Sequence, residues 1–106
     1  MLLRWVADLV GYPASAAGNI ASGGSIATLT AIATARDSHD LKGADFARTV
    51  VYLTSQAHHC VEKALRIAGL KEVQVRHVLM DAHFRMRADA LTEAIGQSLK
   101  AAQQIA

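Results

Sequence analysis

The sequence contains a single cysteine, Cys60, among its 106 residues, so a disulfide within the chain is excluded. Proline is equally rare, and Pro13 stands alone. No apolar stretch approaches the ~20 residues of a membrane-spanning helix, and Arg4 and Asp8 interrupt the apolar run that a signal peptide would need near the start. These absences predict a soluble protein of a reducing, cytoplasmic compartment, with no membrane partner.

Charge of one sign is not concentrated anywhere either. The 11 Lys and Arg residues and the 9 Asp and Glu residues give a formal net charge of +2, and no basic run occurs. The basic pI is therefore weak support for nucleic-acid binding, and we expect no nucleic-acid partner. Hydrophobic residues make up 52% and charged residues 19% of a length that suits one small globular domain.

The most informative stretch is the glycine-rich segment 18–25. It predicts a short buried strand, a turn at 22–25 and then a helix over 26–36. Gly24 carries no Cβ, so a ligand can approach this turn closely. The first N–H groups of a helix lack intrahelical partners and suit a phosphate, to which the Ser25 hydroxyl can also donate. Many such turns only connect and cap, so the turn alone leaves both interpretations open.

The rest of the chain alternates between helix and strand patterns. Apolar residues at helical spacing predict a first helix over 1–10, which Gly11 ends. The β-branched, apolar run 49–54 predicts a strand buried on both faces of a parallel sheet. Period-two alternation predicts another strand over 72–79, with one wetter face. The other predicted segments are a polar loop over 42–48, a helix over 56–69 with Ser55 as its N-cap and Gly69 after its end, a turn over 81–85 and a helix over 87–105.

Helices and strands in this order predict an α/β fold with a mostly parallel sheet and helices on both of its faces. Residues 1–17 form a leading helix and loop, and residues 18–106 form the strand-turn-helix units. Three strands with exposed edges are a poor endpoint for segments this apolar. We therefore expect the chain to be part of a larger domain, or to be completed by a partner chain.

Four motifs, taken in order and spacing over nearly the whole chain, resemble one protein family. They are Trp5 with Leu9-Val10-Gly11-Tyr12-Pro13, then Ser22-Gly23-Gly24-Ser25-Ile26-Ala27-Thr28-Leu29, then Ser55-Gln56-Ala57-His58-His59-Cys60-Val61-Glu62-Lys63-Ala64, and then Asp81 with Phe84-Arg85-Met86. The family is the group II pyridoxal-phosphate decarboxylases, which includes the aromatic-L-amino-acid decarboxylases. The resemblance implies the aspartate aminotransferase-like fold of PLP-dependent transferases, with this chain as the N-terminal part of the large, PLP-binding domain.

The resemblance also implies roles for three residues. The turn at Gly24 and Ser25 matches the one that binds the phosphate of pyridoxal 5′-phosphate. His58 matches the histidine that stacks on the pyridine ring of this cofactor and helps to position the substrate, so it is the catalytic candidate. His59 and Cys60 match no functional position. Adjacent histidines on a helix do not face one site, so we predict no metal site.

Two departures from the family pattern bear on function. Ile26 stands where the family commonly has an acidic residue, although the backbone donors of the turn are unaffected. The family's Schiff-base lysine and the aspartate that pairs with the pyridine nitrogen belong to later motifs, and neither motif is among these 106 residues. The lysines present match neither context: Lys42, Lys63, Lys71 and Lys100. The chemistry needs both groups, so we expect this chain alone to be inactive.

These residues predict a fragment of a PLP-dependent amino-acid decarboxylase, a carboxy-lyase of amino-acid metabolism, and His58 favours the aromatic branch of the family. The complete enzymes resemble obligate dimers, which implies a homodimer and an amino acid as substrate. Two alternatives remain open: a non-covalent phosphate- or nucleotide-binding α/β module, and a ligand-free fragment that associates with itself through apolar edges.

Overall fold

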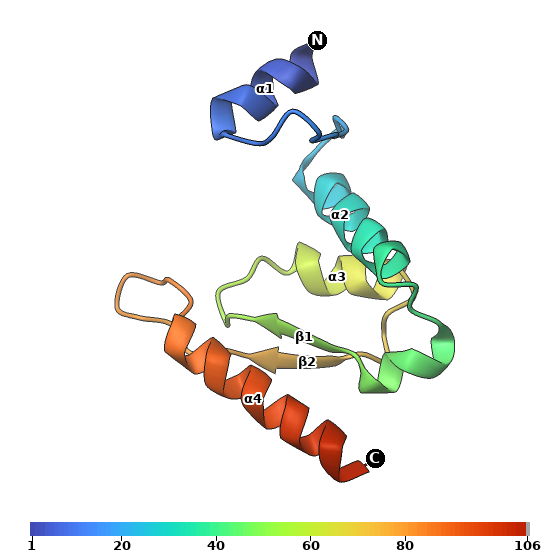
Figure 1. The fold of residues 1–106 in the computed structure, drawn as a ribbon, viewed down its shortest axis with the longest axis vertical. Helices are drawn as coiled ribbons and strands as arrows, with labels where there is room; N and C mark the ends of the chain where they lie inside the picture. The colour runs from blue at the N-terminus through green and yellow to red at the C-terminus, as the bar shows by residue number, and fades with distance from the viewer. Residues whose placement is uncertain (106) are drawn as a thin grey trace.

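The computed structural model describes the backbone of residues 1–105 and the side chains of residues 1–101, so residue 106 of the predicted unit 18–106 lies outside the described residues. Helices and strands alternate along the chain after two leading helices (Figure 1). The elements are helix α1 (Leu2–Val10), helix α2 (Gly24–Ser38), the short 3₁₀ helix η1 (Gly43–Arg48), strand β1 (Val50–Leu53), helix α3 (Cys60–Ile67), strand β2 (Gln74–His77) and helix α4 (Ala88–Ile105).

β1 and β2 form a parallel pair, with Val50 opposite Gln74 and Leu53 opposite His77. Helix α3 connects the two strands in the sequence, so β1, α3 and β2 make one parallel crossover unit of the kind that α/β folds repeat. Every residue of β1 is apolar and half-buried, as expected of a strand covered on both faces. The predicted α/β class and the parallel pairing are confirmed for this unit.

Helices cover both faces of the sheet. Successive side chains of each strand point to opposite faces, so the apolar residues of β1 need cover on both sides. Val51 and Val75 pack on the side of α3, against the core cluster. Their neighbours Tyr52 and Arg76 point to the other side, where both bind the hydroxyl of Ser98 in α4, at 2.6 Å and 2.5 Å. Figure 1 shows α3 and α4 on opposite sides of the strands. The core cluster consists of Leu65, Ala68, Leu70 and Val73.

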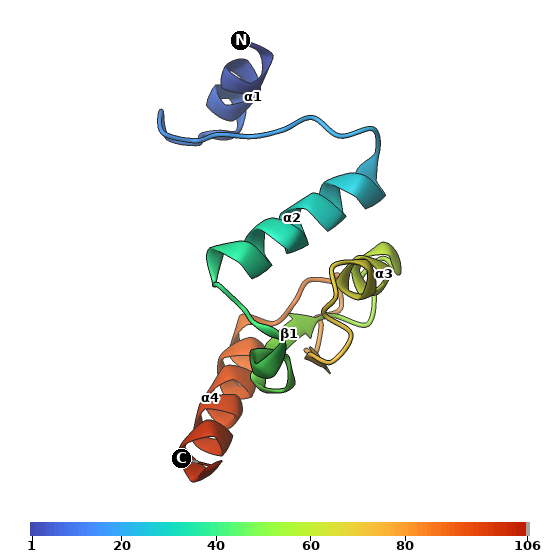
Figure 2. The ribbon, with the colours of Figure 1, turned by 90° about the vertical axis from the view of Figure 1, so that its right-hand side faces the viewer.

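The strand predicted at the start of the glycine-rich segment is wrong. Residues 18–21 form no strand, and Ile20 is 68% exposed. Figure 2 shows this stretch as part of a long, open connection between α1 and α2. A strand needs a neighbouring edge for its backbone N–H and C=O groups, and neither described strand lies beside this stretch. The described sheet therefore has two strands where the sequence predicted three.

The segment predicted as a polar loop over 42–48 is also more ordered than expected. It contains η1, whose start is closed by a hydrogen bond of 3.0 Å from the Lys42 N–H to the carboxylate of Asp45. Phe46 of this turn packs against the core cluster. The hydrogen bond to Asp45 and the packing of Phe46 both hold this turn in place.

Helix α1 ends where the sequence predicts. Gly11 has a φ of 84°, in the left-handed region that glycine tolerates best. Arg4 holds the following loop against the helix by donating to the Asp8 carboxylate and to the carbonyl of Pro13. The apolar side of α1 is nonetheless exposed, with Trp5 at 60%, and the helix stands apart from the other elements in both views (Figures 1 and 2).

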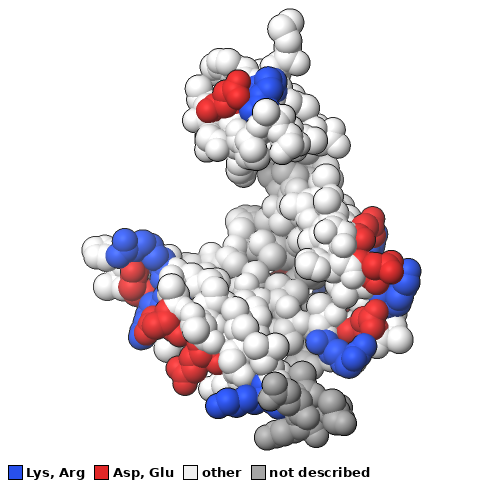
Figure 3. All heavy atoms as spheres, in the orientation of Figure 1, with Lys and Arg blue, Asp and Glu red and all other residues white. Residues whose placement is uncertain are grey.

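Many of the charged side chains on the surface lie in close pairs of opposite sign. Arg4 pairs with Asp8, and Lys42 pairs with Asp40 at 2.7 Å. Figure 3 shows acidic and basic groups side by side at the margins of one face, around an uncharged centre.

Among the residues that the structure describes, no helix combines the length and the apolarity that crossing a bilayer requires.

The predicted turn over 81–85 is confirmed, and Asp81 organises it. Its carboxylate accepts the backbone N–H groups of His83 at 2.8 Å and Arg85 at 3.0 Å, and the Arg85 guanidinium at 2.8 Å. Met80 and Met86 then pair across the base of the loop. These hydrogen bonds to the ionised carboxylate lower the pKa of Asp81 below its ordinary value, and the largest effect comes from the backbone N–H of Arg85.

Asp81→Asn is expected to reduce the loss of unfolding free energy that the protein shows when the pH is lowered. Because the folded-state pKa lies below the ordinary value of 3.8, the contribution of Asp81 is present above that value and is lost as the pH falls through the lowered pKa. The variant should be less stable than the wild type near neutral pH and should lose less stability on acidification. Urea unfolding at several pH values measures this.

The matched control for that experiment is Glu72→Gln, because Glu72 is exposed and belongs to no ion pair of the described residues. Its profile should follow the wild type. The organising role of Asp81 is contradicted when Asp81→Asn loses as much stability on acidification as the wild type does.

Candidate functional site

Helices α2 and α3 lie side by side and run in the same direction. Near their starts, the Cys60 thiol lies 3.9 Å from the hydroxyl of Thr28. At their ends, the Arg36 guanidinium donates to the carbonyl of Ala68 at 2.5 Å. The two helix N-termini therefore lie at the same end of the molecule, and α3 begins there because it follows the loop that leaves the carboxyl end of β1.

The start of α2 offers three backbone donors. Its first helical hydrogen bond runs from the Ala27 N–H to the Gly23 carbonyl at 3.0 Å, so the N–H groups of Gly24, Ser25 and Ile26 precede the helical ladder. No side chain caps this end among the described residues, and the turn is exposed. These donors, together with the positive end of the helix dipole, suit an anion.

The glycines of this turn leave space that nothing in the described chain fills. A Cβ added at Gly23 or Gly24 would meet no atom within 4 Å. Gly23 has a φ of 171°, an extended conformation that any residue can adopt. Neither packing nor backbone strain within the described residues therefore requires glycine here, and the missing Cβ atoms matter only to something that approaches the turn from outside.

Ser25 also lines a small open groove of about 220 Å³ between α2 and α3. The α3 side of this groove is formed by residues at positions i, i+3, i+4 and i+7 of one helix face: Cys60, Lys63, Ala64 and Ile67. Lys63 thus lines the same groove as Ser25. Reasoning from the sequence missed Lys63 as a functional neighbour, although its spacing from Cys60 and Ala64 could have indicated the shared face.

His58 lies in the loop before α3, and not within a helix as predicted. The predicted helix over 56–69 begins only at Cys60, so the expected N-cap at Ser55 is wrong. The chain first turns through a hydrogen bond of 3.1 Å from the Ala57 N–H to the Thr54 carbonyl. The other end agrees with the prediction, because Gly69 follows the helix with a φ of 82°.

The side chain of His58 is exposed and has two defined neighbours. Its Nδ1 accepts a hydrogen bond from the backbone N–H of Cys60 at 3.1 Å. Its ring is stacked with that of His59, with 4.2 Å between the ring centroids and 27° between the planes. In the described part of the chain, no cluster of three or more His, Cys, Asp or Glu side chains could hold a metal ion.

The structure thus brings Gly24, Ser25 and His58 to one end of the molecule. The first two begin α2, and His58 precedes the start of α3, which runs parallel to α2. This end is also the carboxyl end of the parallel strands, which is where open α/β sheets bind ligands. No hydrogen bond joins Ser25 to His58 among the described residues, so their common role stays a prediction.

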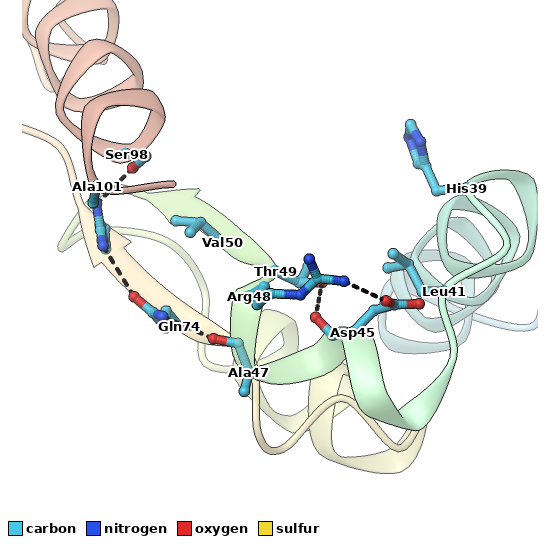
Figure 4. A pocket seen from close by; sticks show the side chains of 11 residues that line it. His39, Leu41, Asp45, Ala47, Arg48, Thr49, Val50, Gln74, Ser98 and Ala101 are labelled. Carbon is cyan, nitrogen blue, oxygen red and sulfur yellow. Dashed lines mark hydrogen bonds and ion pairs between the residues drawn. The ribbon is translucent and has the colours of Figure 1, made fainter. Parts of the chain in front are cut away.

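A second groove, of about 720 Å³, lies at the opposite end of the strands (Figure 4). It includes Val50 and Gln74, the first residues of β1 and β2, and Ser98 of α4. Its polar side chains bind one another, as in the pair of Arg48 with Asp45 at 2.9 Å. Its position at the amino ends of parallel strands is not where such sheets bind ligands.

Comparison with known proteins gives a match over almost the entire chain. A model of the pyridoxal-dependent decarboxylase conserved domain matches residues 1–105. The chain belongs to this family. The cofactor of the family is pyridoxal phosphate.

Individual relatives of this chain are also named as decarboxylases. An aromatic-L-amino-acid decarboxylase of Bacillus atrophaeus is 37% identical over 93 residues, which is 88% of this chain and 19% of the relative. An aromatic-L-amino-acid decarboxylase of Cavia porcellus is 34% identical over 90% of this chain and 23% of the relative. A probable L-tyrosine/L-aspartate decarboxylase of Methanospirillum hungatei JF-1 is 30% identical over 92% of this chain and 24% of the relative. The chain therefore spans a quarter or less of the length of these family members.

Proposed function

We propose that this chain forms part of the cofactor site of a pyridoxal-phosphate-dependent amino-acid decarboxylase, a carboxy-lyase. Gly24 and Ser25 bind the cofactor phosphate, and His58 stacks on its pyridine ring. The observation that carries the proposal is the set of unpaired backbone donors at the start of α2, at the same end of the molecule as His58. The family of the chain supplies the identity of the anion.

The residues at the start of α2 fit a phosphate group. Three N–H groups and the Ser25 hydroxyl can donate to its oxygens, and the space next to Gly23 and Gly24 admits a close approach. Lys63, a basic residue, lines the groove that Ser25 also lines. Ile26, where the family commonly has an acidic residue, keeps its backbone donor, and its side chain is 49% exposed.

The residues present bind and orient, and they do not complete the reaction. When bound, pyridoxal phosphate accepts the electron pair that is released with CO2. His58 holds a flat ring at the strand end, so it can orient the cofactor and the substrate. Of the lysines, Lys42 pairs with Asp40 at 2.7 Å and Lys63 lies on α3. We infer that a lysine outside these 106 residues binds the cofactor covalently, and that the chain alone is inactive.

The substrate that we propose is an aromatic amino acid. Two of the relatives are named as aromatic-L-amino-acid decarboxylases, and their matches extend over most of this chain. We further propose that the working enzyme is a cytoplasmic homodimer. Support for a partner comes from the exposed apolar side of α1, where Leu9 is 69% exposed.

Ser25→Ala tests the phosphate assignment. In the enzyme that contains this chain, the change should weaken pyridoxal phosphate binding by about ten- to a hundredfold, because one hydrogen bond to a charged group contributes ~1.5–3 kcal/mol. Equilibrium titration of the enzyme with the cofactor measures the effect. The matched control is Ser38→Ala, since Ser38 is also exposed but is the last residue of α2, at the opposite end of the helix.

Equal cofactor affinity in the Ser25→Ala variant and the wild type would contradict the assignment. The same titration with a free nucleotide tests the alternative of a non-covalent nucleotide-binding module. Tight nucleotide binding by the wild type, with no preference for pyridoxal phosphate, would favour that module over the decarboxylase.

A further inference from the structure

The side chain of His58 is held by the backbone of the helix that follows it. Its Nδ1 accepts a hydrogen bond from the N–H of Cys60, the first residue of α3, at 3.1 Å. The N-cap residue of α3, His59, makes no capping bond with its own side chain. An imidazole nitrogen that accepts a hydrogen bond carries no proton, so the proton of the neutral His58 ring is on Nε2.

His59 covers one face of the His58 ring. The ring centroids lie 4.2 Å apart and the planes are inclined by 27°, an arrangement in which flat rings attract each other. A flat ring has only two faces, so a ligand can stack on the other face alone. The stack also opposes rotation of the His58 ring, which would break both the contact and the hydrogen bond to Cys60.

We propose that His59 is a positioning residue. Together with the N–H of Cys60, it holds the His58 imidazole as a single tautomer, with the Nε2–H group and one ring face free for a ligand. This inference rests on the proposed function, because it gives a purpose to the orientation of the ring that stacks on the cofactor. Neither His59 nor Cys60 was expected from the sequence to have a role.

The tautomer decides what His58 can recognise. Its Nε2 has no hydrogen-bond partner among the described residues, so this N–H group is free to donate to an anionic oxygen of a ligand. The opposite tautomer would present an acceptor at the same place and would select a donor group instead. The nearest carboxylate on α3, that of Glu62, faces His77 at 3.9 Å.

The experiment is an NMR measurement of imidazole ¹⁵N shifts in the histidine-labelled protein, at a pH where the rings are neutral and without cofactor. The ratio of the two tautomers is read for His58 and for His83, which is exposed and whose ring has no hydrogen bond in the described chain. We expect the Nε2–H tautomer of His58 to be favoured about fivefold more than that of His83, because one hydrogen bond of ordinary strength supplies such a factor. Equal ratios would overturn the proposal.

Two variants test His59 itself. His59→Ala removes the stacked ring and should bring the tautomer ratio of His58 towards that of His83. His59→Phe keeps a flat ring and should preserve the wild-type ratio. An unchanged ratio in His59→Ala, or equal loss in both variants, would overturn the role of His59. The signals of His39 and His77 report in the same spectra that the fold is retained, and His59→Gln replaces the alanine variant if that variant fails to fold.

Pyridoxal phosphate is added only after the tautomer has been read. Stacking should then shift the His58 ring signals and leave those of His83 in place, because aromatic rings change the field only of nearby nuclei. Signals of His58 that do not move at this stage would overturn the proposed cofactor contact and not the tautomer. The two failures are therefore separate results of one set of samples.

Discussion

Val51→Asp is expected to abolish cooperative folding of this chain. The Val51 side chain packs against the core cluster on the α3 side of the sheet, next to Val75. An aspartate there would lose the apolar contacts and would leave a carboxylate without a partner among apolar groups, at a cost of several kcal/mol. That cost approaches the ~5 kcal/mol of net stability found for small domains. Circular dichroism during urea unfolding measures it.

The matched control is Leu79→Asp, which makes the same kind of change at a position that is 66% exposed. This variant should unfold cooperatively, close to the wild type, because its carboxylate stays in water. A soluble Val51→Asp variant with the same cooperative transition would contradict the packing of β1 against α3.

His58→Ala is expected to have the largest effect on activity. In the enzyme that contains this chain, turnover of an aromatic amino acid should fall by about a hundredfold, the usual cost of misplacing reacting groups by about 1 Å. Cofactor affinity should change far less, because we propose that Gly24 and Ser25, and not His58, bind the phosphate. Assays of CO2 release, together with cofactor titration, separate the two quantities.

The control for this variant is His39→Ala, since His39 is an exposed histidine at the far end of α2. It should leave both turnover and cofactor affinity unchanged. Should His58→Ala retain wild-type turnover with the cofactor fully bound, the assignment of His58 to the site would be wrong.

The parts of the fold that the sequence predicts are those set by local chemistry. The run at β1 is apolar throughout and β-branched in part, which favours a strand covered on both sides, and its four residues are half-buried. Gly11 and Gly69 end their helices because a left-handed residue is needed there, with φ values of 84° and 82°. The turn at Asp81 follows from one carboxylate that binds nearby backbone N–H groups.

The errors arise where a distant partner decides the conformation. Ile20 is a residue type that favours strands, but residues 18–21 have no neighbouring strand edge and form no regular secondary structure. Ser55 is a good N-cap by residue type, yet the ring of His58 takes the first N–H of α3, and the helix starts at Cys60. Neither outcome can be calculated from local preference, because each depends on which groups meet in space.

The residues of the candidate site also fall into those that local sequence indicates and those that depend on packing. Gly24 and Ser25 could be found because a glycine-rich turn before a helix binds anions by its backbone alone. Lys63 was missed because its place beside Ser25 depends on how α2 packs on α3. The stack of His59 on His58 was missed for a similar reason, since it requires the two residues to lie in a loop and not on a helix.

The bond between Arg36 and the carbonyl of Ala68 has a consequence at the other end of α2. The helix from Ser25 to Arg36 is about 16 Å long, since an α-helix rises about 1.5 Å per residue. A hydrogen-bonded helix resists compression, so α2 moves as one rigid element. The bond from Arg36 fixes its C-terminal end to the end of α3. Without this hydrogen bond, α2 could shift along α3, and the N–H groups at Gly24 and Ser25 would move with it. A residue at the far end of α2 therefore helps to fix the position of the turn at Gly24 and Ser25 relative to α3.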